Sequence, residues 1–279
     1  MTRITSCPAP AKLNLFLHVI GRRADGYHLL QSAFRLIDLH DELDFERRDD
    51  GRIERLTPLD GVRPEDDLVV RAARLLQRET ATNQGASIGL RKRIPMGGGL
   101  GGGSSNAATT LIALNRLWQT GLTRDQLARL GLSLGADVPF FIFGKDAFAE
   151  GVGDLLTPLT LPTSGYVVVH PGISVPTAKI FSSEHLTRDS EPIRITDFAS
   201  DATRNDLQAA ACKLFPEVAN AVAWLEQFAP AIMTGSGACV FAEVNDHDTA
   251  ARIVEQCPAP WRAWLVRSIS QHPLHDWLA

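Results

Sequence analysis

The chain is organised around one run of residues, which reads Pro95–Met96–Gly97–Gly98–Gly99–Leu100–Gly101–Gly102–Gly103–Ser104–Ser105. Six of the seven positions from 97 to 103 are glycine. Such a composition fits neither a strand nor a helix interior, where each glycine costs about 1 kcal/mol relative to alanine. Glycine adopts positive φ angles and has no Cβ to keep other groups away from its backbone. We therefore interpret the run as a loop whose N–H groups can turn towards an anion.

The residues around the loop predict a strand before it and a helix after it. Residues 86–90 and 91–94 read as extended structure, and Ser104 or Ser105 is the expected cap of the following helix. Apolar residues then recur at helical spacing, at Ala107, Leu111, Leu114 and Trp118, with Ala108 and Ile112 beside them. This arrangement predicts a phosphate cradle, because free N–H groups and the positive end of the helix dipole meet there.

Three other interpretations of the loop fit the residues less well. A lysine-bearing P-loop needs Gly-Lys-Ser or Gly-Lys-Thr after the glycines, and the sequence has neither there. The dinucleotide pattern matches formally as Gly97-x-Gly99-x-x-Gly102, but it needs a strand with an acidic residue soon after the helix. A second helix is predicted there instead, with Thr123 and Gln126 spaced as a capping box. A flexible linker would lack the strand and helix flanks.

Two further motifs accompany the loop, Pro10–Ala11–Lys12–Leu13–Asn14–Leu15 and Thr234–Gly235–Ser236–Gly237–Ala238–Cys239–Val240–Phe241. In order and spacing, the three segments resemble those of the GHMP small-molecule kinases, and the resemblance covers nearly the whole chain. It implies an α+β fold of two domains, an N-terminal ATP-binding α/β domain over residues 1–160 and a C-terminal ferredoxin-like domain over residues 161–279. It also implies that Pro95–Ser105 binds the phosphates of ATP.

The residues themselves predict a series of further elements. Strands are expected over residues 11–20, 34–43, 166–170, 232–233, 238–243 and 261–268, with two more between residues 147 and 160. Helices are expected over residues 66–79, 123–130, 176–184, 205–214, 217–228 and 248–256. Asp49–Gly51 reads as a hairpin turn, and the domain boundary is expected near residues 158–165.

Lys12 and Asp137 are the candidate catalytic residues. Alternation along residues 11–20 places Lys12 on one face with Asn14, and by itself this reads as a solvated surface lysine. Asp137 precedes Pro139 and fits a helix cap, but its apolar flanks put the carboxylate at the edge of a buried region, where it is expected to be paired or functional. The resemblance implies that Asp137 accepts or orients the proton of the acceptor hydroxyl, as a base or as an electrostatic anchor. Lys12 would keep it ionised and stabilise the attacking oxygen.

The acceptor is inferred from the resemblance. The segments Arg23–Ala24–Asp25–Gly26–Tyr27–His28 and Leu134–Gly135–Ala136–Asp137–Val138–Pro139 resemble the branch of the family that phosphorylates the 2-hydroxyl of a cytidine diphosphate of methylerythritol, in the non-mevalonate isoprenoid pathway. In that branch a cytosine ring lies between aromatic side chains and is read by a histidine. The matching positions are Tyr27, His28 and Phe181, with Thr177 nearby and Asn14 towards the diphosphate. From local sequence, Phe181 also reads as helix core and His28 as a loop-surface histidine.

Composition limits the remaining classes. A formal net charge of −4 over 279 residues argues against a nucleic-acid partner, which needs a basic face. The four cysteines are far apart, so we predict no disulfide scaffold or zinc site and expect a cytoplasmic protein. No signal core or membrane-spanning run is visible, and we expect no membrane partner and a monomer or a weak homodimer.

Two rival functions stay open on the sequence. A kinase for mevalonate, homoserine or a sugar would share the three glycine motifs without needing a cytosine clamp. A nicotinamide-dependent oxidoreductase is supported only by the formal glycine pattern. We predict no metal site built by the protein, and expect Mg²⁺ to arrive with ATP.

Overall fold

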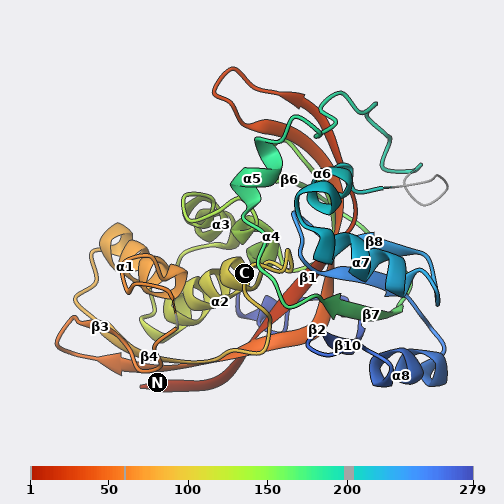
Figure 1. Cartoon of the computed structure of the whole chain (residues 1–279). Helices are drawn as coiled ribbons and strands as arrows, with labels where there is room; N and C mark the ends of the chain where they lie inside the picture. Colours follow the sequence, from red (N-terminus) through yellow and green to blue (C-terminus); the bar gives the residue numbers. More distant parts are fainter. Residues whose placement is uncertain (1, 60, 198–203, 279) are drawn as a thin grey trace.

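The structure is a computed structural model that describes residues 2–59, 61–197 and 204–278. Over these residues the chain forms two β-sheets with helices packed on each (Figure 1). The strands of the first sheet are β1 (Arg3–Arg22), β2 (His28–Arg48), β3 (Ile53–Arg55), β4 (Gly85–Arg91), β5 (Ala147–Glu150) and β6 (Leu155–Pro158). Those of the second are β7 (Gly165–His170), β8 (Ala231–Met233), β9 (Val240–Glu243) and β10 (Arg262–Arg267).

Two long strands, β1 and β2, form the central pair of the first sheet. They pair antiparallel from Arg3↔Glu46 to Arg22↔His28, well beyond the predicted ranges 11–20 and 34–43. The other edge of β2 is shared by β4 and β5. The predicted turn at Asp49–Gly51 is present, but it does not close a hairpin, because β4 lies between β2 and β3 and pairs with β3 in parallel.

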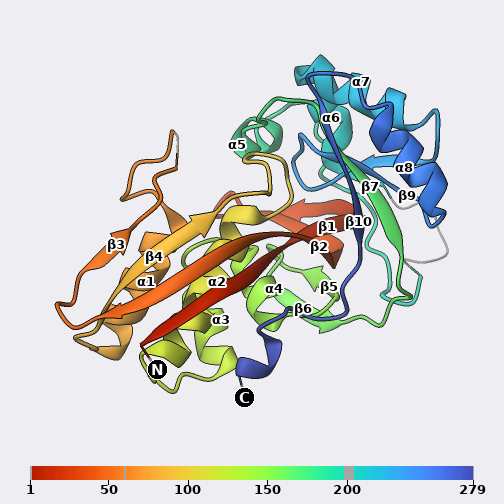
Figure 2. The same ribbon diagram turned by 90° about the horizontal axis from the view of Figure 1, so that it is seen from below.

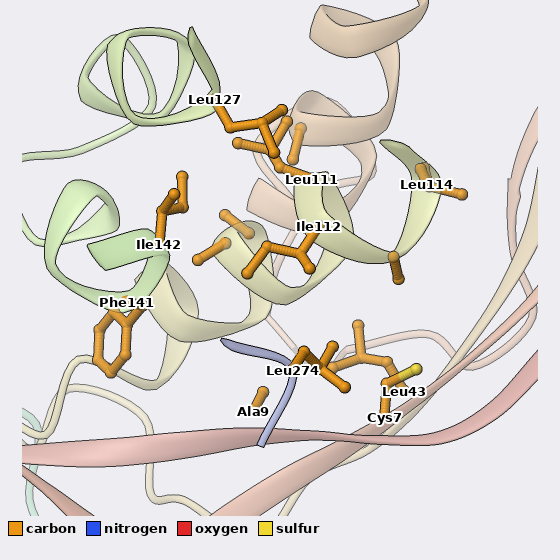
Figure 3. Close-up of a cluster of buried hydrophobic side chains, with 14 of the residues drawn as sticks. Cys7, Ala9, Leu43, Leu111, Ile112, Leu114, Leu127, Phe141, Ile142 and Leu274 are labelled. Atoms are coloured by element: carbon orange, nitrogen blue, oxygen red, sulfur yellow. The ribbon is translucent and has the colours of Figure 1, made fainter. Parts of the chain in front are cut away.

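Helices α1 (Leu68–Thr80), α2 (Gly102–Leu117), α3 (Arg124–Leu132) and α4 (Val138–Phe143) cover one face of this sheet (Figure 2). Figure 3 shows the apolar side chains of α2, α3 and α4 meeting those of β1 and β2 in one cluster. The capping box of Thr123 and Gln126 is confirmed at the start of α3. The predicted serine cap of α2 is wrong, because the cap position is Gly101 at φ +71° and neither Ser104 nor Ser105 occupies it.

The second sheet has the strand order β10–β7–β9–β8, with every neighbouring pair antiparallel. Two helices, α6 (Asp206–Leu214) and α7 (Pro216–Leu225), connect β7 to β8, and α8 (His247–Glu255) connects β9 to β10. This is the ferredoxin-like arrangement expected of the second half. The short helix α5 (Thr177–Phe181) precedes them. None of the helices in the described ranges has the length and apolar character needed to cross a membrane.

The two sheets pack on each other along β1. Ala11 and Leu13 of β1 contact a buried cluster that includes Val168 of β7 and Leu100 of the glycine loop. Leu17 and Val19 continue into the core of the second sheet. Both faces of β1 are therefore buried, and the seam between the sheets contains the glycine loop. The division at residues 160 and 161 stays a prediction, and the outer limits of the two domains, Met1 and Ala279, lie outside the described residues.

Candidate active site

A cavity of about 1010 Å³ opens where the glycine loop meets β1, α4 and α5. It brings together both predicted catalytic residues and all five predicted acceptor-binding residues, Lys12, Asp137, Asn14, Tyr27, His28, Thr177 and Phe181. Ten of the eleven predicted ATP-binding residues, Pro95 to Ser104, also line it. Ser105 does not, because its side chain is fully buried at the start of α2. Residues far apart in the sequence thus share one site.

The first half of the glycine loop is shaped by a second glycine turn, Thr234–Gly237. Ala238 N–H donates to the carbonyl oxygen of Gly97 at 3.2 Å, and Cys239 N–H donates to that of Gly98 at 3.1 Å. Gly99 has φ +74°, and a Cβ there would lie 2.1 Å from the carbonyl oxygen of Thr234. Only glycine fits at position 99, because the backbone of the Thr234–Gly237 turn occupies the space that a Cβ would need.

The second half of the loop opens α2. Gly101 turns the chain with φ +71°, and Gly102, Gly103 and Ser104 form the first turn of the helix. The N–H groups of a first turn have no carbonyl partner within their own helix. They lie at the positive end of the helix dipole and line the cavity. This end of the loop is the part that can bind phosphate oxygens.

Lys12 and Asp137 form an ion pair beside the loop. Lys12 Nζ lies 3.6 Å from Asp137 Oδ2, with the lysine side chain 4% exposed and the aspartate side chain 34% exposed. Burial lowers the pKa of Lys12, and the Asp137 carboxylate acts in the opposite direction. Asp137 stands at the cap position of α4 but makes no capping hydrogen bond with its side chain. The surface-lysine alternative is therefore wrong, and the cap prediction for Asp137 is right about the position but wrong about the side chain, which pairs with Lys12 instead.

The backbone of the loop places Lys12. Its N–H donates to the carbonyl oxygen of Leu100 at 3.0 Å, and its Nζ donates to Asn14 Oδ1. The ammonium group also lies 5.1 Å from the centre of the Phe34 ring. A Cβ on Gly101 would come within 3.2 Å of Lys12 Cγ. The ammonium group is consequently fixed relative to the first turn of α2.

Asn14 and Thr177 connect the cavity to the glycine turn. Asn14 Nδ2 donates to Ser32 Oγ at 2.8 Å, while the Asn14 N–H donates to Thr234 Oγ1 at 3.0 Å. Thr177 Oγ1 and Ser236 Oγ are 2.8 Å apart. The Asn14 amide thus positions Lys12 within a buried network, a role beyond the direct acceptor contact that the resemblance implies.

The far end of the cavity is aromatic. The rings of His28 and Phe181 stack with centroids 5.0 Å apart and an interplanar angle of 29°. Tyr27, next to them, is 65% exposed, which leaves its ring free to cover a bound base. Burial lowers the pKa of His28, and the guanidinium groups of Arg188 and Arg22 lower it further. Phe181 is partly buried and packs against the core of the second sheet, so the expectation that it is part of the helix core holds in part, while its ring also lines the cavity. His28 is not an isolated surface histidine, because its ring stacks on that of Phe181.

Sequence reasoning missed the opposite end of the cavity. It is lined by Leu59, Val62, Leu68, Lys92 and Asn106, which belong to no motif singled out above. Lys92 Nζ lies 2.5 Å from Asp41 Oδ2, and the basic run at 91–93 was the one available signal for it. Leu59, Val62 and Leu68 form an apolar wall of the kind that suits a planar base.

ATP fits this arrangement better than a metal held by the protein alone. The first turn of α2 offers N–H groups to phosphate, and the apolar wall lies beside it. Asn106 Oδ1 is buried without a hydrogen-bond partner in the described structure, and oxygen is the donor that magnesium prefers. Within the described ranges, no group of three or more His, Cys, Asp or Glu side chains is placed to hold a metal ion.

Comparison with known proteins agrees with this geometry. The model of the GHMP kinase N-terminal domain matches residues 67–145, and that of the C-terminal domain matches residues 187–263. The 4-diphosphocytidyl-2-C-methyl-D-erythritol kinase of Aromatoleum aromaticum is 66% identical over 278 residues, covering 100% of this chain and 98% of its own. The enzyme of the same name from Dechloromonas aromatica is 59% identical over 268 residues, covering 96% and 98%.

Solved structures give the same result. A crystal structure of 4-(cytidine 5'-diphospho)-2C-methyl-D-erythritol kinase superimposes with a TM-score of 0.82 at 36% identity, covering 95% of this chain and 98% of its own. Homoserine kinase from Cytophaga hutchinsonii shares the fold, with a TM-score of 0.70 at 17% identity and coverage of 98% and 96%. The family models, the full-length relatives and the shared fold together establish that this chain is a small-molecule kinase belonging to the GHMP kinase family.

Proposed function

We propose that this kinase transfers the γ-phosphate of ATP to the 2-hydroxyl of 4-diphosphocytidyl-2-C-methyl-D-erythritol, in the non-mevalonate isoprenoid pathway. One observation carries the proposal. The Lys12–Asp137 pair lies in a single cavity between the first turn of α2 and the aromatic end formed by Tyr27, His28 and Phe181. The names of the full-length relatives support the choice of acceptor.

In this proposal the protein contributes mainly position and charge, which is what phosphoryl transfer requires. The N–H groups of Gly102, Gly103 and Ser104 hold phosphate oxygens. Asp137 Oδ2 receives the proton of the acceptor hydroxyl or orients that hydroxyl for in-line attack. Lys12 Nζ, held 3.6 Å from Asp137 Oδ2, stabilises charge on the attacking oxygen and keeps the carboxylate ionised.

The acceptor is held at the aromatic end. Its cytosine ring stacks between Tyr27 and Phe181, and a stacked base contributes about 1–3 kcal/mol in nucleic-acid binders. His28 reads an edge of the base, and Thr177 lines the same cavity. Mg²⁺ entering with ATP would neutralise phosphate charge, and Asn106 Oδ1, which lines the cavity and has no hydrogen-bond partner in the described structure, is a protein oxygen that could bind it.

An ADP-release assay tests the acceptor. The enzyme is mixed with Mg²⁺, ATP and one of four alcohols: the cytidine diphosphate of methylerythritol, mevalonate, homoserine or galactose. We expect turnover with the first alone. Turnover of another alcohol, without turnover of the cytidine compound, would contradict the acceptor and leave the kinase assignment standing.

We also expect the enzyme to act in a reducing, cytoplasmic setting, since its four cysteines are unpaired thiols. We expect the protein to be a monomer or a weak homodimer, and we do not expect a nucleic-acid partner. Light scattering across a concentration series measures the mass in solution and tests the expected oligomeric state.

A further inference from the structure

We infer that Arg188 is a positioning residue of the acceptor site, which holds the neutral His28 ring in its Nδ1–H tautomer and fixes it against Phe181. This inference rests on the proposed function in one respect, that the acceptor carries a pyrimidine base. Its structural part, the tautomer of His28, does not depend on the identity of the acceptor.

The side chain of Arg188 joins the two segments that form the aromatic end. Its Nε donates to His28 Nε2 at 3.2 Å, and its Nη2 donates to the carbonyl oxygens of Ser183 at 2.8 Å and Phe181 at 3.1 Å. A further bond runs from Nη1 to the carbonyl oxygen of Leu186 at 3.1 Å. His28 begins β2 and Phe181 ends α5, and Figure 1 shows the segment after α5 running beside the β1–β2 hairpin. One planar guanidinium group therefore sets the position of one element relative to the other.

These bonds determine which nitrogen of His28 carries the proton. A guanidinium group has only donors, so His28 Nε2 must be the acceptor. The neutral ring then carries its hydrogen on Nδ1. Burial and the nearby charges of Arg188 and Arg22 lower the pKa of His28, which keeps the ring neutral at pH 7. Among the described residues, none forms a hydrogen bond with Nδ1, so that N–H group is free to bind a ligand.

A donor at Nδ1 has a consequence for base selection. Cytosine has an acceptor at N3, whereas uracil carries a hydrogen at the same position. An Nδ1–H group facing this edge therefore binds cytosine and leaves two donors opposed with uracil, and reading a base through this edge is a general mode of recognition. The opposite tautomer would present an acceptor and would favour the wrong base. Arg188 thus contributes to specificity without touching the acceptor.

The tautomer can be measured directly. Long-range ¹H–¹⁵N correlation spectra of the free enzyme, with His28 assigned by its loss in His28→Gln, distinguish a protonated from an unprotonated ring nitrogen. We expect the Nδ1–H form in the wild type, and a mixed or Nε2–H form with a raised His28 pKa in Arg188→Met. Arg194→Met removes an exposed arginine of the same segment and should change neither. An Nε2–H ring in the wild type would overturn the inference, and so would an unchanged tautomer in Arg188→Met.

Kinetics with two acceptors test the functional part. Arg188→Met should raise KM for the cytidine acceptor by about tenfold, the scale of one charge-assisted hydrogen bond, with KM for ATP unchanged. In the same variant, the preference for the cytidine acceptor over its uridine analogue, measured as the ratio of the two kcat/KM values, should decrease. Adding Arg188→Met to His28→Gln should cost little more, because Arg188 acts through His28. Equal losses with ATP and acceptor, or an intact base preference, would overturn the role in selectivity.

The two failures can be told apart. If the wild type phosphorylates no cytidine acceptor, the proposed function fails, and the spectra of the free enzyme still decide whether Arg188 sets the tautomer. If the wild type uses the cytidine acceptor and Arg188→Met keeps its base preference, the inference fails and the proposed function stands.

Discussion

Lys12 is a buried cation beside one partly exposed carboxylate, and these two surroundings set its pKa in opposite directions. Desolvation lowers the pKa of Lys12, and Asp137 opposes that effect. The ammonium group also donates to Asn14 Oδ1 and lies over the ring of Phe34. Removing the Asp137 carboxylate would leave Lys12 buried without this negative charge, so its pKa would fall further. The two side chains are therefore expected to work as one unit.

Mutating the pair tests this expectation. Asp137→Asn keeps the shape of the side chain but removes the charge, so kcat should fall by about 10²–10⁴, the usual scale for a positioned acid–base group. Lys12→Met should also lower kcat, with a smaller effect on ATP binding because the N–H groups of α2 remain. The double variant should be little worse than the poorer single variant. Losses that add in full would mean that the residues act independently.

His272 predicts a pH-dependent stability. The Leu274 N–H group donates to His272 Nδ1 at 3.0 Å, so the neutral ring carries its hydrogen on Nε2, 3.3 Å from Thr109 Oγ1. Burial lowers the pKa of His272 from 6.5 to about 3. The unfolded chain then binds a proton below pH 6.5 that the folded chain does not bind, so stability falls as the pH falls.

Urea unfolding at pH 7 and pH 5 measures this effect. The His272 contribution to the free energy of unfolding should decrease by about 2 kcal/mol between these pH values. His272→Gln, although less stable overall, should show a correspondingly smaller decrease. An equal decrease in both proteins would mean that His272 is not the group responsible.

At the scale of elements, the glycine loop serves two purposes in its two halves. Gly97 and Gly99 lie against other backbone and side chains, where a Cβ would come within 1.9 Å of Ser174 Oγ and 2.1 Å of the Thr234 carbonyl oxygen. Gly101 has a different constraint, since its Cβ would meet Phe141 Cζ at 2.9 Å and Lys12 Cγ at 3.2 Å. A valine at Gly101 would therefore displace the side chain of Lys12 as well as change the shape of the loop.

A matched pair of alanine variants separates these effects. Gly99→Ala should lower kcat/KM for ATP by about 10²-fold, because displacing the loop by about 1 Å misplaces the phosphate-binding groups. Gly89→Ala, in β4 and outside the cavity, should have little effect, since its Cβ would meet only the Asp44 side chain, at 3.7 Å. Steady-state kinetics and thermal melts of both variants provide the check. Equal activities would show that contact with the Thr234–Gly237 turn does not shape the ATP site.

At the scale of the molecule, the end of the chain returns to the first sheet. The Ile269 N–H group donates to the carbonyl oxygen of Leu36 at 3.0 Å, and Leu274 is buried in the cluster of α2 and β1 (Figure 3). Arg124 of α3 joins this tail to α4, donating to the carbonyl oxygens of His275 and Ile142, each at 2.8 Å. Since α4 follows Asp137 directly, the tail braces the helix next to the carboxylate that we propose to be catalytic.

Loss of this brace should lower stability. Arg124→Met would leave partly buried carbonyl groups without this donor and should decrease the free energy of unfolding by about 1–3 kcal/mol, the scale of one unsatisfied group. Arg129→Met, on an exposed position of the same helix, is the control. Urea unfolding of both variants measures the difference. A loss no larger than that of the control would show that the tail contributes little through Arg124.

The sequence by itself determined the local chemistry of this protein. Its glycine run predicted a phosphate-binding loop, the family resemblance carried by its three motifs implied a two-domain kinase, and Thr123 and Gln126 predicted a helix start that the structure confirms. Such features depend on residues a few positions apart, where backbone preference and side-chain capping act. The family resemblance added the site residues, and the structure brings nearly all of them into one cavity.

Only the tertiary structure decided what depends on contacts between distant segments. The burial of Lys12, the insertion of β4 between β2 and β3, and the cap of α2 at Gly101 all differed from the sequence-based expectation. The Arg188–His28 bond spans 160 residues and has no local signature. Strand pairing, burial and ion pairing depend on which segments come into contact in the folded protein. These contacts join residues far apart in the sequence, so local sequence patterns do not reveal them.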